Sequence, residues 1–360
     1  MTGYRYFHQI SQGCMRALKA TPKTAFLPIF LFTLLLVSCN ESRVKSDYFS
    51  STWERIVYFT WYGEKKINFQ DGSRYKGQIN KIGQKHGKGK FRWPDGTKYI
   101  GEWKHDKMEG TGSIFYTDNA FYSGEWNSGK FEGKGIYQWR SKARFDGQFS
   151  AGMPHGKGIY TWADGRHYSG QFAFGLKQGQ GIYTWPGDRQ YIGEFKNDLP
   201  EGQGTLIFVN KEEYNGEFLA GEMHGKGFYT WPDGRTYRGD FSHEKKSGEG
   251  TFSWATGEKY IGQFLNNEMS GIGTLIWADG NRYLGEFRHG LKSGKGTFEF
   301  ADGRRYVGEF KDDRMNGSGE FIFKDGSKFV GNFIDDKIAN KGTCYQNNRV
   351  YACIYPNDQG

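Results

Sequence analysis

A segment of the form Tyr-x-Gly-x-Phe recurs along this chain every 23 residues, after a first copy that carries one extra residue. Glycine fills the third position of every copy, and the fifth is Phe, Trp or, once, Ile. A constant period of this length is the signature of a repeat architecture, so it limits the possible folds before any other feature does. The copies begin at Tyr75, Tyr99, Tyr122, Phe145, Tyr168, Tyr191, Tyr214, Tyr237, Tyr260, Tyr283, Tyr306 and Phe329.

A second segment, Gly-x-Gly-x-aromatic-x-Trp, follows, as in Gly225–Trp231 (GKGFYTW), and its last position is aromatic in all eleven complete copies. Both segments alternate with a period of two, which predicts strands rather than helices. Asp-Gly then follows in many copies, for example Asp233-Gly234, whereas Ser141-Lys142 and Lys211-Glu212 replace it in two. Because glycine accepts a positive φ, Asp-Gly predicts a two-residue hairpin turn. Each copy is therefore expected to be a β-hairpin.

The alternation also assigns side chains to faces. Tyr, Gly and Phe of the first segment should share one face, and so should both glycines and both aromatics of the second segment. The other face carries Lys, Glu, Gln, Thr and Arg. We expect each ring to lie over the glycine notch of a neighbouring hairpin, so that stability comes from contacts between adjacent repeats. Where ring faces stay open, the aromatic column also suits the binding of sugars or aromatic groups; the candidate residues are Trp162, Trp185, Trp231 and Trp254.

Composition agrees with a thin, repetitive β-structure. Aromatic residues make up 18% of the chain, which argues against disorder, yet there are 54 glycines and the mean hydropathy is −0.77. The predicted fold class is all-β: an elongated, twisted single-sheet solenoid of tandem 23-residue hairpins. About eleven repeats at about 9.6 Å each would extend roughly 105 Å.

These residues resemble the MORN repeat, whose pattern is Tyr-x-Gly-x-Phe, a spacer, Gly-x-Gly and often Asp-Gly. The resemblance covers residues 75–342. It implies an elongated, twisted single-sheet solenoid. It also implies a role in scaffolding, in protein interaction or in association near membranes. We expect no cofactor.

The N-terminal residues 1–39 read as a signal peptide. Residues 26–38 (FLPIFLFTLLLVS) are an uncharged apolar run preceded by Arg16, Lys19 and Lys23. This run is short for a membrane span and suits a signal-peptide core. Its end, Leu36-Val37-Ser38-Cys39, resembles the lipobox of bacterial lipoproteins, which implies that Cys39 is acylated and becomes the new N-terminus. The alternative is a plain signal peptide or anchor, and Met15 is an alternative start.

The remaining segments frame the array. Residues 40–52 are a polar tether, 53–74 an N-terminal capping half repeat, 75–342 the tandem repeats and 343–360 a C-terminal capping hairpin. Cys344 and Cys353 flank Asn347-Asn348. If the loop spans residues 347–350, the two cysteines face each other, and in an oxidising envelope they can form a disulfide; the alternative is two buried thiols.

Features that suggest chemistry have simpler explanations. His86, His155 and His224 recur three repeats apart, about 29 Å, and His105, His243 and His289 are also too far apart to share a metal. The segment 290–297 lacks the spacing of a phosphate loop. A further column is expected to be solvated: Glu102, Glu125, Glu194, Glu217, Glu286 and Glu309. Outside residues 1–39 the net charge is mild, without the basic stripe of a nucleic-acid binder.

The sequence therefore predicts a non-enzymatic repeat scaffold. A lipid on Cys39 would tether it to a membrane of the cell envelope, and protein partners would bind the array. If the host is a Gram-negative bacterium, Asn40 after the cysteine favours the outer membrane, facing the periplasm. The alternative is an aromatic-lined module that binds envelope polysaccharide or phospholipid headgroups.

Overall fold

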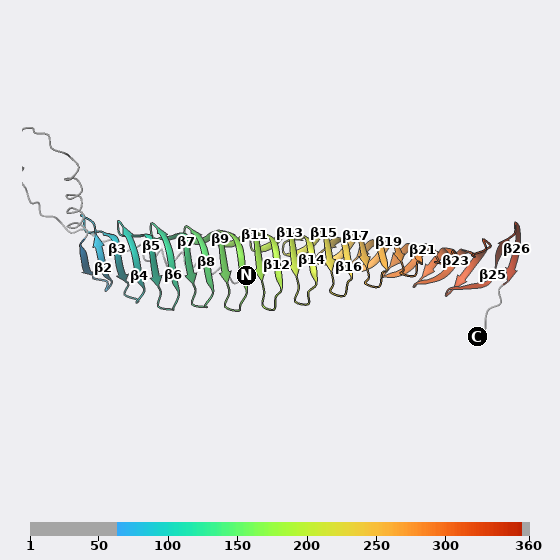
Figure 1. Cartoon of the computed structure of the whole chain (residues 1–360), viewed down its shortest axis with the longest axis horizontal. Coiled ribbons are helices and arrows are strands. Elements are labelled where there is room, and N and C mark those ends of the chain that lie inside the picture. The colour runs from blue at the N-terminus through green and yellow to red at the C-terminus, as the bar shows by residue number, and fades with distance from the viewer. Residues whose placement is uncertain (1–62, 355–360) are drawn as a thin grey trace, which may run out of the picture. The chain divides into compact units, whose positions relative to one another are not determined.

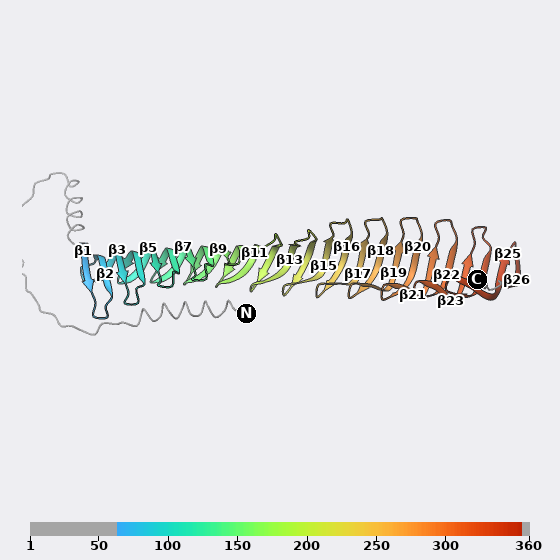
Figure 2. The same ribbon diagram turned by 90° about the horizontal axis from the view of Figure 1, so that it is seen from below.

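In the computed structural model the described residues are 63–354, and every regular element among them is a β-strand. The chain divides into two compact units, residues 1–177 and 178–360. Within each unit, consecutive strands lie side by side and pair antiparallel (Figure 1 and Figure 2). The prediction of an all-β array of tandem hairpins is confirmed.

The strands of the first unit are β1 (Glu64–Asn68), β2 (Arg74–Ile79), β3 (Lys85–Arg92), β4 (Lys98–Lys104), β5 (Lys107–Phe115), β6 (Phe121–Asn127), β7 (Lys130–Gln138), β8 (Arg144–Ser150), β9 (Met153–Thr161) and β10 (His167–Ala173). Strand β11 (Leu176–Thr184) contains the boundary between the units. The second unit continues with β12 (Gln190–Lys196), β13 (Leu199–Ile207), β14 (Glu213–Leu219), β15 (Glu222–Thr230), β16 (Thr236–Ser242), β17 (Lys245–Ser253), β18 (Lys259–Leu265), β19 (Glu268–Ile276), β20 (Arg282–Arg288), β21 (Leu291–Glu299), β22 (Arg305–Lys311), β23 (Arg314–Ile322), β24 (Lys328–Ile334), β25 (Lys337–Gln346) and β26 (Arg349–Ile354).

The Asp-Gly turn is a three-residue loop, so the prediction of a two-residue turn there was wrong. Between β15 and β16 the Trp231 N–H donates to the Arg235 carbonyl at 3.0 Å, and the Gly234 N–H donates to the Trp231 carbonyl at 3.0 Å. Of the loop residues only Gly234 has a positive φ, at 92°. This is a type I turn followed by a left-handed residue, the common three-residue hairpin connection. Proline, as Pro232, is favoured at the second position of such a turn, which the two-residue prediction ignored.

The two-residue turns lie at the opposite margin of the sheet, where sequence analysis assigned no turn. Leu219 pairs with Glu222 across Ala220 and Gly221, whose φ angles are 51° and 95°. Positive φ at both central residues defines a type I′ turn, whose twist matches that of the strands it joins. Several of these turns use His, Asn or Asp instead of glycine, which hides them from a search for Asn-Gly or Asp-Gly.

The conserved pair of central glycines is covered by a ring of the same repeat. Gly216 lies directly opposite Gly227, and a Cβ placed on Gly227 would come within 2.7 Å of the Tyr214 hydroxyl oxygen. A Cβ on Gly216 would lie 2.6 Å from the Gly227 Cα. Each Tyr therefore fills the notch made by its own strand and the strand that follows it, to which the two-residue turn connects it.

The first glycine of Gly-x-Gly has a different task. Strand β15 bulges after the Gly216–Gly227 pair, because the next pair is Glu217 with His224, and Gly225 adopts a φ of 59° in this bulge. A Cβ on Gly225 would meet the Glu217 carboxylate on the opposite face, not a ring. The assignment of this glycine to the aromatic face was wrong, because a bulge breaks the two-residue alternation.

The copies without glycine in the three-residue loop give the first prediction. Lys211 takes the place of that glycine at a φ of 67° and keeps the hydrogen bond from its N–H to the Phe208 carbonyl at 2.9 Å. The alignment of Lys211-Glu212 with Asp-Gly was therefore wrong by one residue, because Asn210-Lys211 occupies those positions. We expect Lys211→Gly to raise the local free energy of unfolding by about 0.5–1 kcal/mol, the left-handed penalty less the added chain entropy of glycine. Native-state hydrogen exchange in β13 and β14 measures the gain. In the control Gly234→Lys, exchange in β15 and β16 should show a loss of stability; unchanged protection in both variants contradicts the prediction.

Candidate functional site

The tyrosine column forms the interior of the array. Tyr214 has 0% exposure, and its hydroxyl donates to the Glu217 carbonyl at 2.8 Å. Its ring meets Phe218 of its own repeat and Phe241 of the next edge-on, with centroid distances of 5.2 and 4.9 Å. Such edge-to-face pairs are favourable beyond the area they bury. These rings are structural and present no open face to a ligand.

Burial also sets the ionisation of this column. Removal of the phenol from water raises the pKa of Tyr75 to about 12, and the charge of Asp106 adds to the shift. For Tyr306 burial is again the largest cause, followed by Glu309, and its pKa rises to about 12. The hydroxyls therefore remain protonated donors to the backbone at physiological pH.

The predicted binding tryptophans occupy the start of the three-residue loops. Trp162, Trp185, Trp231 and Trp254 are each half-buried. They extend ladders of rings rather than standing alone. In the second unit, one ladder has successive centroid distances of 5.9, 4.4, 5.5 and 4.6 Å; its members are Phe208, Tyr229, Trp231, Phe252 and Trp254.

Arginines of the same loops lie over three of these four tryptophans. The guanidinium carbon is 5.4 Å from the ring centroid for Arg166 over Trp162 and 5.2 Å for Arg235 over Trp231. Arg189 lies 4.5 Å from the Trp185 centroid. These are cation–π distances, so the arginines compete with any sugar that would stack on the same rings. Trp254 differs because Glu258 occupies the arginine position of its loop.

Lysines enter the same face at the position that pairs with the Phe of Tyr-x-Gly-x-Phe. Lys246 pairs with Phe241, and its ammonium lies 4.5 Å from the Phe252 centroid and 5.8 Å from that of Trp231. Lys292 repeats the arrangement 5.2 Å from Phe298. Desolvation is the main reason that the pKa of both lysines is lowered, and for Lys246 the charge of Arg235 adds to it. Met269 and Met315 fill this position in other repeats, so the lysines substitute for apolar packing residues.

The opposite face carries a row that sequence analysis missed. Ile261, Leu284 and Val307 are 43%, 43% and 38% exposed, and we call them the aliphatic row. Threonines of the intervening strands pair directly with them, as Thr274 does with both Ile261 and Leu284. The row thus runs without interruption across β18 to β22. Its signal was available in the sequence, because the second position of Tyr-x-Gly-x-Phe is aliphatic in all three repeats.

Charged residues border the aliphatic row. Arg282 and Arg305 lie 3.3 and 4.0 Å from the Glu299 carboxylate on one side of it. On the other side Glu286 accepts a hydrogen bond from the Lys295 N–H at 3.0 Å. The glutamate column faces solvent, as expected, and Glu102, Glu125, Glu217 and Glu309 also accept N–H groups of the bulge.

Comparison with known families identifies the repeat. The family model described as "MORN repeat" matches eleven consecutive segments. The chain belongs to the MORN-repeat family. The matched segments are residues 75–98, 99–120, 122–144, 145–165, 168–187, 191–212, 214–234, 237–259, 260–282, 283–304 and 306–328. MORN repeats are in general repeats of protein and membrane interaction.

Solved structures show only distant likeness to this MORN protein. A mutant TCP10 domain of CPAP from Danio rerio is 12% identical, with a TM-score of 0.24, and the match covers 68% of this chain and 93% of that one. The SAS-4 TCP domain of Drosophila melanogaster, solved with a proline-rich motif of Ana2, is 11% identical with a TM-score of 0.22, covering 64% and 99%. A virginiamycin B lyase from Staphylococcus aureus is 12% identical with a TM-score of 0.13, covering 83% and 89%. No curated protein matches the sequence.

Some histidines of the described part of the MORN array meet in pairs, but they form no metal-binding cluster. Within residues 63–354 no three His, Cys, Asp or Glu side chains lie close enough to hold a metal ion. The two histidine columns do meet, however: the ring centroids of His86 and His105 are 5.6 Å apart, and those of His224 and His243 are 6.1 Å apart. These contacts between the two columns were not predicted, because the spacing within each column says nothing about the distance between the columns.

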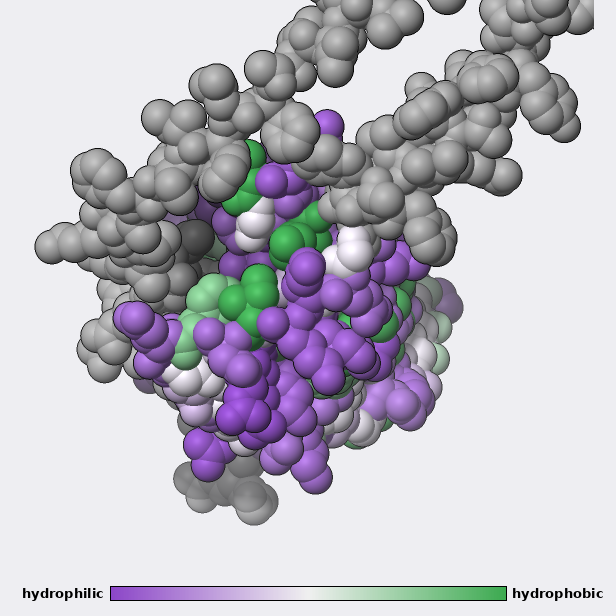
Figure 3. Space-filling model, turned by 90° about the vertical axis from the view of Figure 1, so that its left-hand side faces the viewer, coloured by the Kyte–Doolittle hydropathy of each residue, from purple (hydrophilic) through white to green (hydrophobic). Residues whose placement is uncertain are grey.

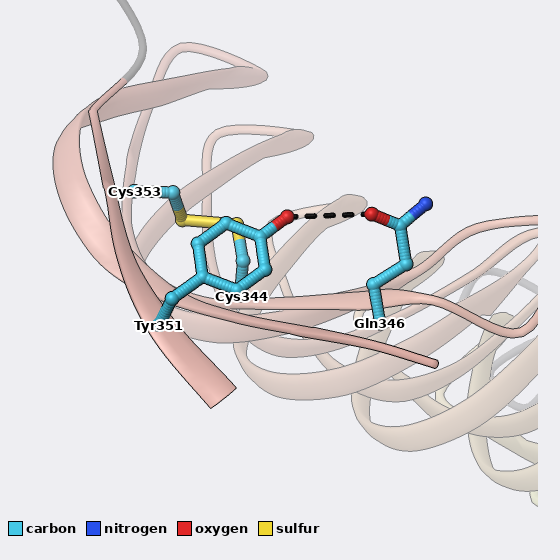
Figure 4. The surroundings of a disulfide bond; sticks show 4 residues. All are labelled: Cys344, Gln346, Tyr351 and Cys353. Carbon is cyan, nitrogen blue, oxygen red and sulfur yellow. Dashed lines mark hydrogen bonds between the residues drawn. A yellow bond between two sulfur atoms is a disulfide. The ribbon is translucent and has the colours of Figure 1, made fainter. Parts of the chain in front are cut away.

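The cysteines of the last hairpin are bonded to each other. Cys344 and Cys353 form a disulfide with a Cα–Cα distance of 5.8 Å (Figure 4). The turn is Asn347-Asn348, so Cys344 pairs with Tyr351 and Cys353 with Gly342. The bond therefore joins diagonal neighbours on one face, and the expectation of directly facing cysteines around a 347–350 loop was wrong. Cys39 and the rest of the leader lie outside the described residues, within which no helix is long and apolar enough to cross a membrane.

The second prediction compares three positions of one repeat that differ in burial: Tyr214, Gly227 and Trp231. We expect Tyr214→Ala to cost about 3–5 kcal/mol, because it empties a fully buried site. Gly227→Ala should cost about 1–3 kcal/mol by overpacking against Tyr214, whereas Trp231→Ala should cost less than Tyr214→Ala because its ring is half-buried.

Local unfolding free energies from hydrogen exchange in β14–β16 measure this order, since damage in a repeat array stays local. Exchange in β20–β22 is the internal control and should not change. Unchanged stability of Gly227→Ala would overturn the notch geometry, and a loss for Trp231→Ala as large as that for Tyr214→Ala would overturn the assigned order.

Proposed function

We propose that this MORN protein is a non-enzymatic scaffold of the cell envelope that binds protein partners on the face opposite the tyrosines. The observation that carries the proposal is the difference in exposure between the two faces of the sheet. The tyrosine rings are buried within the hairpins, whereas the aliphatic row is exposed and continuous. Apolar surface bordered by charged residues is typical of protein-binding sites.

The charges support a protein partner over a glycan. Arg282, Glu299 and Arg305 beside the aliphatic row offer groups of both signs, which fix the register of a protein partner. The alternative function, binding of envelope polysaccharide or phospholipid headgroups by the tryptophans, needs open ring faces or free cations. Three of the four candidate tryptophans already carry an arginine.

A crosslinking pull-down of the full chain from its own cells tests the partner surface. We expect the combined substitutions Ile261→Glu, Leu284→Glu and Val307→Glu to reduce recovery of specific proteins at least about tenfold, which corresponds to 1.4 kcal/mol of binding free energy. The matched control replaces three residues at strand ends, Leu219, Leu265 and Ile334, which are 50%, 59% and 60% exposed, by Glu. Equal recovery from both variants, or recovery of glycan or lipid alone, contradicts the proposal.

We also propose that a lipid on Cys39 tethers the protein to a membrane, with the outer membrane facing the periplasm as the expected location. The support is the lipobox-like Leu36–Cys39 behind the apolar run 26–38. Cys39→Ala should abolish incorporation of radiolabelled palmitate, because the thiol is the acylation site. Cys14→Ala is the matched control and should label normally; undiminished labelling of Cys39→Ala refutes the tether.

A further inference from the structure

Strand β26 is the last described strand of the second unit, and the composition of its outer margin is unusual. Its residues 350–354 (VYACI) carry no charge, and Val350 and Ile354 are 63% and 71% exposed. Among the described strands β26 pairs only with β25. Natural proteins usually protect such a margin with charged residues, proline or a covering element, because it can pair with another strand.

The first strand of the other unit shows the usual protection. Strand β1 reads EKKIN, and its Glu64, Lys65 and Lys66 are exposed. The end of the molecule that carries β1 is mostly hydrophilic in Figure 3. The contrast in composition singles out β26 as the margin that is suited to pairing.

The register of the last hairpin shows which backbone groups face outward. The two-residue turn Asn347-Asn348 is closed by the pair Gln346–Arg349, whose groups bond to each other across the turn. Hydrogen-bonded pairs then alternate along an antiparallel ladder, so Tyr351 and Cys353 bond to β25. Val350, Ala352 and Ile354 therefore direct their N–H and C=O groups to the outer margin.

The sequence of this margin is complementary to itself. If a second β26 runs antiparallel with Ala352 opposite Ala352, each Val350 lies opposite an Ile354. Val350, Ala352 and Ile354 all direct their backbone groups to the outer margin. The pairing therefore forms about six backbone hydrogen bonds. Val350 and Ile354 are the two most exposed apolar residues of the strand, and this register places them against each other as a cross-strand pair.

The same register continues a surface of the array. Ala352 pairs with Thr343, and Thr343 pairs with Val330. These residues share the face of the aliphatic row, so a two-fold axis at Ala352 would extend that face into the second copy. The Cys344–Cys353 disulfide holds β26 against β25, so that the outer margin of β26 stays in a position to pair. We propose that two copies of this chain associate through antiparallel pairing of β26 with β26.

The test compares the mass of the purified full chain by light scattering over a wide range of concentration. The wild type should form a dimer. Ala352→Pro removes an outward N–H while leaving the bonds to β25, because proline is tolerated on an edge strand, and it should weaken dimerisation at least about tenfold. Ala352→Val, which keeps the N–H, should dimerise like the wild type.

A second pair of variants tests the side-chain contacts. Val350→Lys should weaken dimerisation because it places a charge opposite Ile354 of the second copy. Val209→Lys, at a loop residue that is 60% exposed, is the matched control and should not. Mass spectrometry of the Cys344–Cys353 peptide shows that the last hairpin is intact in every variant. A monomeric wild type, a dimer that survives Ala352→Pro, or crosslinks between copies away from β26 would overturn the proposal.

Discussion

The packing of one tyrosine ring onto two glycines of its own hairpin is the interaction on which the rest of the structure depends. Gly216 and Gly227 can lie opposite each other at close range only because neither has a side chain, and the Tyr214 ring covers both. Its hydroxyl then donates to the Glu217 carbonyl, beside the bulge that follows. The ring therefore fixes the register, the bulge and the inward face together.

This constraint explains how far the sequence could be interpreted. The 23-residue period, the strands and the burial of Tyr214 and Phe218 follow from alternation and were predicted. The turn at Asp-Gly was predicted but its length was not, because Trp231-Pro232-Asp233-Gly234 folds as a type I turn. The two-residue turns were not predicted, because they use ordinary residues such as Ala220. The orientation of Gly225 was not predictable either, since a bulge reverses a face without any change in the period.

The candidate site was less predictable than the fold. Trp162, Trp185 and Trp231 were recognised as rings that a ligand could use, but nothing in their spacing says that an arginine lies over each. The aliphatic row was overlooked because a polar column was expected there, although Ile261, Leu284 and Val307 recur at the repeat period. Interaction surfaces in such a protein arise at the variable positions, because the invariant ones are occupied in holding each hairpin together.

The self-contained notch has a consequence for how such a chain can evolve. Because Tyr214 covers glycines of its own repeat, and meets the next repeat through a Phe that nearly every repeat supplies, the loss or duplication of one 23-residue copy breaks no unique contact. Recombination between near-identical copies of the coding sequence can therefore change the number of hairpins while the protein remains foldable. The length of the array is then a quantity that selection can adjust in steps of one hairpin.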